Sequence, residues 1–200
     1  MAEKTTQYVI LGFLAQGTPL SGYDIRKWIG LTVSHFWNES FGQLYPELQR
    51  LTKSGLVTAV VSTKGKRRRV AYRITAAGRR SLAAWLLKPP AAERVRNELL
   101  LKVFFGHDAA RDTLLQHMQT AAARWEAGLE ELGAAQRQLV HDDAQSPELV
   151  YFIITLRHGR WVRAARLKWA QESAELLQLA GKRGNRAVIA RVAQLEGALP

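Results

Sequence analysis

A helix pattern, two strand patterns and a dense run of cations follow one another between residues 40 and 75, and this order constrains the fold more than any other feature. The helix is expected over residues 40–54, because Ser40 and Gln43 have the spacing of a capping box. Gly55 is expected to end it, since glycine adopts a left-handed conformation without a steric penalty. Leucines at the helical period are expected to point inward and polar residues outward. The inward positions are Leu44, Leu48 and Leu51, and the outward positions are Gln43, Glu47, Gln49, Arg50 and Lys53.

Pro46 interrupts this helix pattern. A proline beyond the first turn of a helix removes a backbone hydrogen bond. We therefore expect Pro46 either to kink the helix or to delay its regular start by a few residues.

Two short segments rich in β-branched residues follow the helix and predict a β-hairpin. The strands are expected over residues 56–62 and 70–75, with residues 63–69 as the loop between them. Five cations surround Gly65 in this loop and repel one another unless an anion is near. A charge run is usually a solvated loop, but a hairpin tip directly after a polar, basic helix favours a wing that contacts phosphate. The five cations are Lys64, Lys66, Arg67, Arg68 and Arg69.

The positive charge of the chain is concentrated in its N-terminal half. The net charge of the whole chain is +12. Residues 1–90 contain 14 Lys and Arg against 4 Asp and Glu, a net charge of +10, whereas residues 91–200 contain 15 against 13, a net charge of +2. This asymmetry is typical of a nucleic-acid-binding domain joined to a domain of another kind.

Features that the sequence lacks disfavour several classes of protein. The chain has no cysteine, so it has no disulfide framework, no thiolate nucleophile and no cysteine zinc site. Its five histidines lack the spacing of metal ligands, and it contains no nucleophile–base arrangement or glycine-rich phosphate loop. The N-terminus does not resemble a signal peptide, and no apolar stretch approaches the roughly 20 residues that a membrane span needs. We therefore expect a cytoplasmic protein without a catalytic site, a metal, a cofactor or a membrane partner.

The elements around the central stretch complete the order of a known DNA-binding domain. Helices are predicted over residues 6–16 and from Ser21, which is suited to cap a helix. Thr75 is expected to cap a further helix, which residues 88–90, Lys-Pro-Pro, would end. Two short helices, a third helix and a β-hairpin make up a winged helix-turn-helix domain, which we place at residues 1–88.

The rest of the chain is predicted to be helical. One helix is expected over residues 92–106, and a long helix with apolar residues at near-heptad spacing is expected to begin at Asp108. Residues 146–148, Ser-Pro-Glu, supply a cap, a proline at the first helical position and an acid in the first turn. The next helix is therefore expected to start there and to run to about residue 180.

Helices of this length cannot bury their apolar stripes against one small domain. Two long antiparallel helices in each chain, paired across a twofold axis, would form a bundle interface. We interpret residues 91–180 as a helical domain for dimerisation and effector binding, and residues 181–200 as a tail that could contain a short helix. The expected fold class is mainly α with a small β-hairpin.

The sequence resembles the PadR-like family of transcriptional regulators through an ordered set of short segments. The segments are residues 8–14 (YVILGFL), 21–25 (SGYDI), 41–48 (FGQLYPEL), 50–51 with 55–57, 72–75 with Gly78, and 96–105 (RNELLLKVFF). No single segment is diagnostic, but the ordered set is specific and extends over about residues 6–180. The resemblance implies a homodimer that represses transcription, with the third helix in the major groove of double-stranded DNA and the wing against the backbone.

The resemblance also assigns roles to residues of the third helix. Ser40, Gln43 and Tyr45 are expected to face the groove or the phosphates, which agrees with the ability of glutamine to read base edges and of helix N-termini to bind phosphate. Tyr45 has an alternative interpretation as a core aromatic residue with a bonded hydroxyl. Arg50 and Lys53 complete the set on this helix. The hairpin cations are expected to add salt-dependent affinity with little specificity. A dimer would contact successive major grooves about 34 to 36 Å apart, so the operator is expected to be pseudo-palindromic.

Aromatic and cationic residues in the helical half raise the question of an effector site. Phe104, Trp125 and Trp161 are the candidates for a pocket that binds a small aromatic effector near the dimer interface, with ordinary core packing as the alternative. Four arginines recur every third residue and are expected to be solvated or paired with acids, with the anchoring of an anionic effector as the alternative. The arginines are Arg157, Arg160, Arg163 and Arg166, and the acids are Glu126, Glu130 and Glu131.

Three functions are compatible with these patterns. The first is a sequence-specific transcriptional repressor that is relieved by a small-molecule effector. The second is a non-specific nucleic-acid-binding protein, which would share the basic hairpin but show no operator preference. The third is a small-molecule carrier or enzyme in the helical half, for which the sequence supplies no catalytic arrangement. We expect the first.

Overall fold

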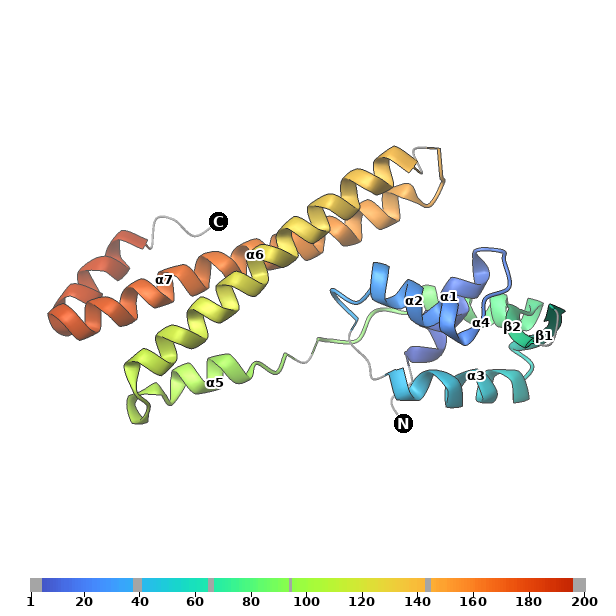
Figure 1. The fold of residues 1–200 in the computed structure, drawn as a ribbon, viewed down its shortest axis with the longest axis horizontal. Helices are drawn as coiled ribbons and strands as arrows, with labels where there is room; N and C mark the ends of the chain where they lie inside the picture. The colour runs from blue at the N-terminus through green and yellow to red at the C-terminus, as the bar shows by residue number, and fades with distance from the viewer. Residues whose placement is uncertain (1–4, 38–40, 65–66, 94, 143–144, 196–200) are drawn as a thin grey trace. The chain divides into compact units, whose positions relative to one another are not determined.

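The chain divides into two compact units, Met1–Glu93 and Arg94–Pro200. The structure is a computed structural model, and it describes residues 5–37, 41–64, 67–93, 95–142 and 145–195 (Figure 1). Helices dominate both units, and the described strands form one antiparallel hairpin in the first unit. The predicted fold class is therefore confirmed.

The N-terminal unit packs four α-helices and the hairpin around one core. Its elements are α1 (Thr6–Ala15), α2 (Gly22–Thr32), the 3-10 turn η1 (Phe41–Gln43), α3 (Leu44–Lys53), β1 (Val57–Lys64), β2 (Arg67–Ile74) and α4 (Ala76–Leu86). Leucine and isoleucine side chains from α1, α2 and α3 form the centre of this core. Those at most 1% exposed are Ile10, Leu11, Leu14, Ile25, Leu48 and Leu51. Burying each of them stabilises the fold by about 1.5–3 kcal/mol.

The helix caps predicted at Ser21 and Thr75 are confirmed. The Asp24 N–H donates to the Ser21 hydroxyl at 3.2 Å, and the Ser21 N–H donates to the Asp24 carboxylate at 2.9 Å, which makes a reciprocal capping box at the start of α2. The Gly78 N–H donates to the Thr75 hydroxyl at 3.0 Å at the start of α4. These caps satisfy amides that have no partner within their own helices.

The third helix begins later than its sequence pattern predicted. The regular helix starts at Leu44, after the 3-10 turn, and Ser40 lies outside the described residues. Pro46 is thus the third residue of α3, where the backbone N–H has no intrahelical partner and a proline costs no hydrogen bond. The delayed start expected from Pro46 is confirmed, and the start predicted at residue 40 is wrong.

The end of α3 agrees with the prediction. Gly55 has a φ of +71°. Its N–H donates to the Thr52 carbonyl at 3.1 Å, and the Leu56 N–H donates to the Leu51 carbonyl at 3.0 Å. This pair of bonds is the Schellman motif, and it turns the chain directly into β1.

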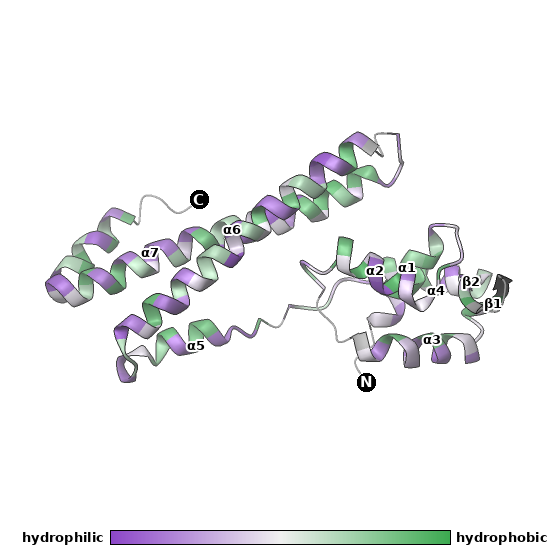
Figure 2. Cartoon of the chain, viewed as in Figure 1, coloured by the Kyte–Doolittle hydropathy of each residue, from purple (hydrophilic) through white to green (hydrophobic). Residues whose placement is uncertain are grey.

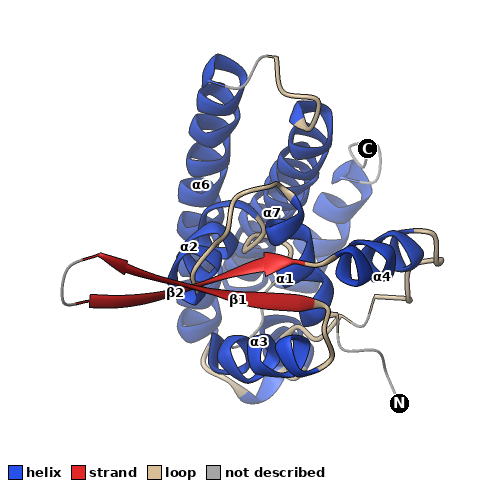
Figure 3. Ribbon diagram, turned by 90° about the vertical axis from the view of Figure 1, so that its right-hand side faces the viewer, coloured by secondary structure: helices blue, strands red, loops and turns tan. Residues whose placement is uncertain are grey.

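The hairpin strands are longer than predicted. The register pairs Val57 with Ile74 at the core end and Lys64 with Arg67 at the outer end, so only residues 65–66 separate the strands. The loop predicted over residues 63–69 is therefore wrong. A charge run favours a loop, but a backbone ladder tolerates charged residues where a strand projects into solvent. Figure 3 shows the strands as one long hairpin that extends beyond the helices of its unit.

The C-terminal unit is a long antiparallel helical hairpin with a short helix beside it. Its elements are α5 (Glu98–Phe104), the 3-10 turn η2 (Gly106–Asp108), α6 (Arg111–Asp142) and α7 (Leu149–Leu195). Hydrophilic and hydrophobic residues alternate along α6 and α7 (Figure 2), as expected for helices with one buried side. Met118, Ala121 and Trp125 from α6 pack with Ala170 from α7.

The boundaries of these helices differ from the predictions. The first begins at Glu98, where the Asn97 side chain accepts from the Leu100 N–H at 3.2 Å, and not at residue 92. The second begins at Arg111 and not at Asp108, and the third begins at Leu149, just after the predicted Ser-Pro-Glu start. Among the described helices, none is both long enough and apolar enough to cross a membrane.

The last part of α7, after Gly184, folds back on the part before it. Gly184 has a φ of +70° and interrupts the helix, so the residues up to Leu195 form a separate short helix. The Arg191 guanidinium makes two hydrogen bonds to the Glu175 carboxylate, from Nε at 2.9 Å and from Nη2 at 3.0 Å. This ion pair raises the pKa of Arg191 through its hydrogen bond to Glu175. The short helix considered for the tail is therefore present.

Candidate nucleic-acid interface

The outer face of α3 is polar and exposed. Gln49 and Lys53 lie opposite the buried leucines, and Gln43 is exposed in the preceding turn. Leu44, Leu48 and Leu51 are all buried, as predicted. The helix therefore presents amide and ammonium groups to solvent while its leucines fix it to the core.

Tyr45 lies at the edge of this face. Its side chain is 53% exposed, so the alternative interpretation of a core aromatic residue is wrong. A Cβ atom built on Gly22 would lie 2.6 Å from Cε1 of Tyr45. The tyrosine ring therefore rests directly on the first residue of α2, in space that only a glycine leaves open. Nothing in the sequence pattern links these two residues, which lie 23 positions apart, so the contact is not predictable from the sequence.

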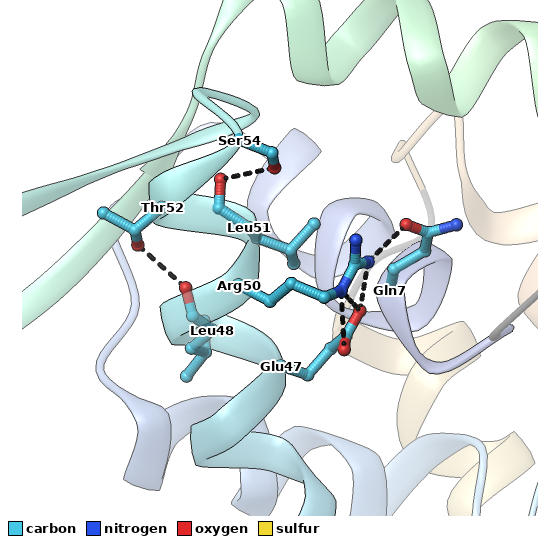
Figure 4. A network of polar contacts seen from close by, with 7 residues as sticks. All are labelled: Gln7, Glu47, Leu48, Arg50, Leu51, Thr52 and Ser54. Atoms are coloured by element: carbon cyan, nitrogen blue, oxygen red, sulfur yellow. Dashed lines mark hydrogen bonds and ion pairs between the residues drawn. The ribbon is translucent and has the colours of Figure 1, made fainter.

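Arg50 is held by two side chains (Figure 4). Its Nε donates to both carboxylate oxygens of Glu47, at 3.1 and 3.0 Å, and its Nη2 donates to the Gln7 side chain of α1 at 2.6 Å. The hydrogen bond with Glu47 raises the pKa of Arg50. The Arg50 side chain is still 47% exposed.

Glu47 was predicted to point outward, and this prediction is wrong. It is only 5% exposed, on the side of α3 that contacts α1. A buried carboxylate needs a compensating charge, and Arg50 one turn later supplies it. The spacing of three residues between Glu47 and Arg50 is the sequence signal that could have predicted this ion pair.

The hairpin cations extend along both strands. Lys64 ends β1, and the arginines at positions 67–69 begin β2, so these four residues belong to the strands and not to a loop. Lys66 lies outside the described residues. The backbone of β2 also pairs with Leu20, through bonds of 3.1 and 2.8 Å between Leu20 and Tyr72, which tie the hairpin to the segment before α2.

The three effector candidates lie in different surroundings. Trp125 is buried with Met118 and Ala170, and its ring centroid is 6.2 Å from that of Trp169. Phe104 is 79% exposed and contacts Phe105 edge to face, and Trp161 is 67% exposed. Neither Phe104 nor Trp161 belongs to the cluster around Trp125. Within the described ranges, no group of three or more acidic and histidine side chains is placed to hold a metal ion.

Two family models match the two units in turn. The model of the transcriptional regulator PadR-like family matches residues 10–84, and the model named virulence activator alpha C-term matches residues 95–178. The negative transcriptional regulator PadR of Bacillus subtilis (strain 168) is 29% identical over 157 residues, which are 76% of this chain and 86% of that protein. Residues 10–84 match the PadR-like family of transcriptional regulators. The family that the sequence resembled is thus confirmed, and it places this chain among transcriptional regulators and not among enzymes.

Solved structures of PadR-like proteins agree with this fold. B. subtilis PadR in complex with operator DNA superimposes with a TM-score of 0.75 at 26% identity, over 87% of this chain and 99% of that one. The PadR-like regulator BC1756 from Bacillus cereus gives a TM-score of 0.71 at 25% identity, over 86% and 98%. The Vibrio cholerae virulence activator AphA gives 0.69 at 26% identity, over 86% and 98%. Residues after 178 lie beyond both family models.

Proposed function

We propose that this PadR-like regulator is a homodimeric repressor that binds a pseudo-palindromic operator and is released by a small-molecule effector. The observation that carries the proposal is the position of the exposed polar face of α3 directly before a cationic hairpin, in the half of the chain that holds a net charge of +10. A relative is described as a negative regulator, and PadR from B. subtilis has been solved with operator DNA and with p-coumaric acid. Such a repressor would act in the cytoplasm.

On this proposal, α3 reads the DNA sequence. Gln43 and Tyr45 face base edges or phosphates, and Lys53 contacts phosphate at the other end of the helix, because lysine offers three donors and a full charge. Ser40, which lies outside the described residues, is also proposed to face the groove or the phosphates. Arg50 contacts phosphate through the exposed part of a guanidinium whose position Glu47 fixes.

The hairpin cations provide affinity and not sequence recognition. Each phosphate that a Lys or Arg neutralises releases condensed counterions, so binding weakens as the salt concentration rises. These cations are Lys64, Lys66, Arg67, Arg68 and Arg69. They would act equally on any DNA sequence, which is why α3 is needed for specificity.

Dimerisation follows from apolar surface that one chain leaves uncovered. Val150, Ile154 and Trp161, which we call the α7 stripe, occupy positions four and seven residues apart and are 53%, 59% and 67% exposed. On α5, Leu101 and Phe104 are exposed as well. Apolar surface of this extent at near-heptad spacing is suited to a second helical hairpin, and we propose that a second copy of residues 91–180 covers it.

A dimer gives the effector a way to act on DNA. Two recognition helices at a fixed separation can occupy successive major grooves, about 34 to 36 Å apart. An effector that binds more tightly to a dimer with a different separation lowers operator affinity by the difference between its binding energies for the two states. The N-terminal domain, residues 1–88, would then respond to an event in the C-terminal domain.

The test is binding to DNA upstream of the protein's own coding region, compared with a scrambled duplex of equal length at several salt concentrations. A preference of about a thousandfold or more is expected for a specific regulator. Equal and steeply salt-dependent affinity for both duplexes would instead favour the non-specific nucleic-acid-binding protein.

A further inference from the structure

The Arg50 guanidinium has five N–H donors, and the chain itself occupies three of them (Figure 4). The Nε–H is shared between the two carboxylate oxygens of Glu47, at 3.1 and 3.0 Å. Of the two N–H groups on Nη2, one donates to Glu47 and the other donates to the Gln7 side chain at 2.6 Å. Within the described part of the chain, Nη1 has no partner, so its two N–H groups are the donors that remain.

The two acceptors hold this guanidinium from two helices. Glu47 lies one turn before Arg50 on α3 and is only 5% exposed, so its surroundings fix the carboxylate. Gln7 belongs to the first turn of α1, and α1 and α3 contact each other in the core of the unit. The packing of α1 on α3 therefore sets the direction of the free Nη1. A group that is held in place before binding loses less conformational freedom when a ligand arrives.

These contacts determine which groups of DNA Arg50 can bind. An arginine reads guanine through two parallel N–H groups, which donate to O6 and N7 of the base. A guanidinium offers such a pair either from Nε and Nη2 or from Nη1 and Nη2, so Nη2 takes part in both pairs. Because both N–H groups of Nη2 are occupied, Arg50 has no pair left for a base. A phosphate oxygen accepts from a single charged donor, which the free Nη1 supplies.

Arg50 also lies at the side of α3 and not at the centre of its outer face. Each residue advances by about 100° around a helix, so Arg50 lies about 100° from Gln49 and about 60° from Lys53. Its hydrogen bond to Gln7 places it on the side that faces α1. The centre of a recognition helix meets base edges, whereas its sides are close to the sugar–phosphate walls of the groove. This position agrees with a contact to phosphate.

We infer that Arg50 donates to a DNA phosphate through Nη1 alone, and that Gln7 of α1 is the positioning residue that directs this donor. The inference rests on the proposed function, because it requires α3 to lie on DNA. It gives α1 a role in DNA binding in addition to its place in the core. It also makes Arg50 a source of affinity and not of base preference.

The experiment measures the affinity of the full-length protein for the upstream duplex and for its scrambled counterpart across a range of salt concentrations. Gln7→Leu removes the acceptor on α1 and keeps a side chain of similar size. It is expected to weaken binding to both duplexes by the same factor, at least threefold. The salt slope is expected to fall by about half to one unit, since one phosphate contact contributes about 0.9.

Gln16→Leu is the matched control, because it makes the same change at an exposed glutamine at the other end of α1. It is expected to bind both duplexes as the wild type does. Urea denaturation of each variant measures its stability, and a loss of stability alone would not alter the salt slope.

Arg50→Gln tests the absence of base reading. This variant removes the charge and keeps an amide that can donate to Glu47. It is expected to weaken binding to both duplexes equally and to keep the wild-type preference at every base pair of the upstream duplex. Gln7→Leu added to Arg50→Gln is expected to cause no further loss, because both changes act on one contact.

Three results would overturn the inference: an unchanged salt slope in Gln7→Leu, a full further loss in the double variant, or the loss of a guanine preference in Arg50→Gln. The scrambled duplex separates this inference from the proposed function. If the salt slope falls as expected but neither duplex is preferred, the role of Gln7 stands and sequence-specific regulation fails. If the upstream duplex is preferred but Gln7→Leu binds as the wild type does, the repressor proposal stands and this inference fails.

Discussion

Replacing Gly22 with alanine tests how α2 positions Tyr45 at the proposed DNA interface. A Cβ atom at this position would lie 2.6 Å from Cε1 of Tyr45, where ordinary contact begins at 3.4 Å. The ring must therefore shift by about 0.8 Å or turn to another rotamer. Because Tyr45 is 53% exposed, its ring can turn into solvent at little cost. Alanine also gains up to about 1 kcal/mol in helix propensity over glycine, so the stability of Gly22→Ala is expected to stay within about 1 kcal/mol of the wild type.

The effect on DNA binding is expected to be larger. On the proposed function, a displaced ring would lose a hydrogen bond to DNA that is worth about 1–1.5 kcal/mol, which corresponds to a loss of operator affinity of roughly five- to twelvefold. Fluorescence anisotropy with a labelled operator measures the affinity, and urea denaturation measures the stability of the same preparation.

The control for Gly22→Ala is an alanine substitution at another helical glycine. Gly12→Ala in α1 adds a Cβ that has no atom within 4 Å, so it is expected to leave operator affinity unchanged. If Gly22→Ala acts through Tyr45, the double variant with Tyr45→Ala should bind no more weakly than Tyr45→Ala alone, since the two changes share one interaction. Wild-type operator affinity in Gly22→Ala would refute the reasoning, and so would a full additional loss in the double variant.

Three further predictions concern the hairpin, the α3 ion pair and the dimer. Replacing the three arginines at positions 67–69 with alanine should weaken binding to every duplex and reduce the salt slope by up to about three units, because each phosphate contact contributes about 0.9; an unchanged slope in a salt titration would exclude their contact with phosphate. Glu47→Ala should reduce the free energy of unfolding by about 1–3 kcal/mol, because the Arg50 guanidinium loses its carboxylate acceptor, and urea denaturation with no change in midpoint would contradict this. Ile154→Asp should shift the protein towards monomer in light scattering, whereas Val140→Asp, an exposed apolar residue outside the α7 stripe, should not.

Local signals in the sequence were sufficient to predict much of the N-terminal unit. Ser21 and Thr75 cap helices through contacts with residues three positions away, and Gly55 ends α3 with the left-handed conformation that glycine favours. Leu48 and Leu51 are buried because the helical period fixes their direction once α3 exists. Each of these predictions depends on a few neighbouring residues.

Predictions failed where the position of a side chain depends on a contact with a residue that is distant in the sequence. Arg50, which pairs with Glu47, also donates to Gln7 of α1, and Tyr45 packs on Gly22. Neither of these two long-range contacts leaves a trace in local spacing. The hairpin loop is shorter than predicted, because strand pairing continues through the charged residues to Lys64 and Arg67. In the C-terminal unit, apolar periodicity continues past the helix ends, so the periodicity could not define the boundaries.

The length of the hairpin bears on how much DNA the protein covers. From the buried Val57 to Lys64, seven steps of about 3.3 Å carry the outer end roughly 23 Å along the strand. That span exceeds the major groove, which is about 12 Å wide. On the proposed function, the outer end of the hairpin would therefore reach phosphates beyond the base pairs that α3 contacts. Nuclease protection should therefore extend outside the bases whose substitution alters affinity. Point substitutions alone would underestimate the length of DNA that the protein covers at each operator. Two protein dimers on adjacent operators would compete for the same flanking phosphates.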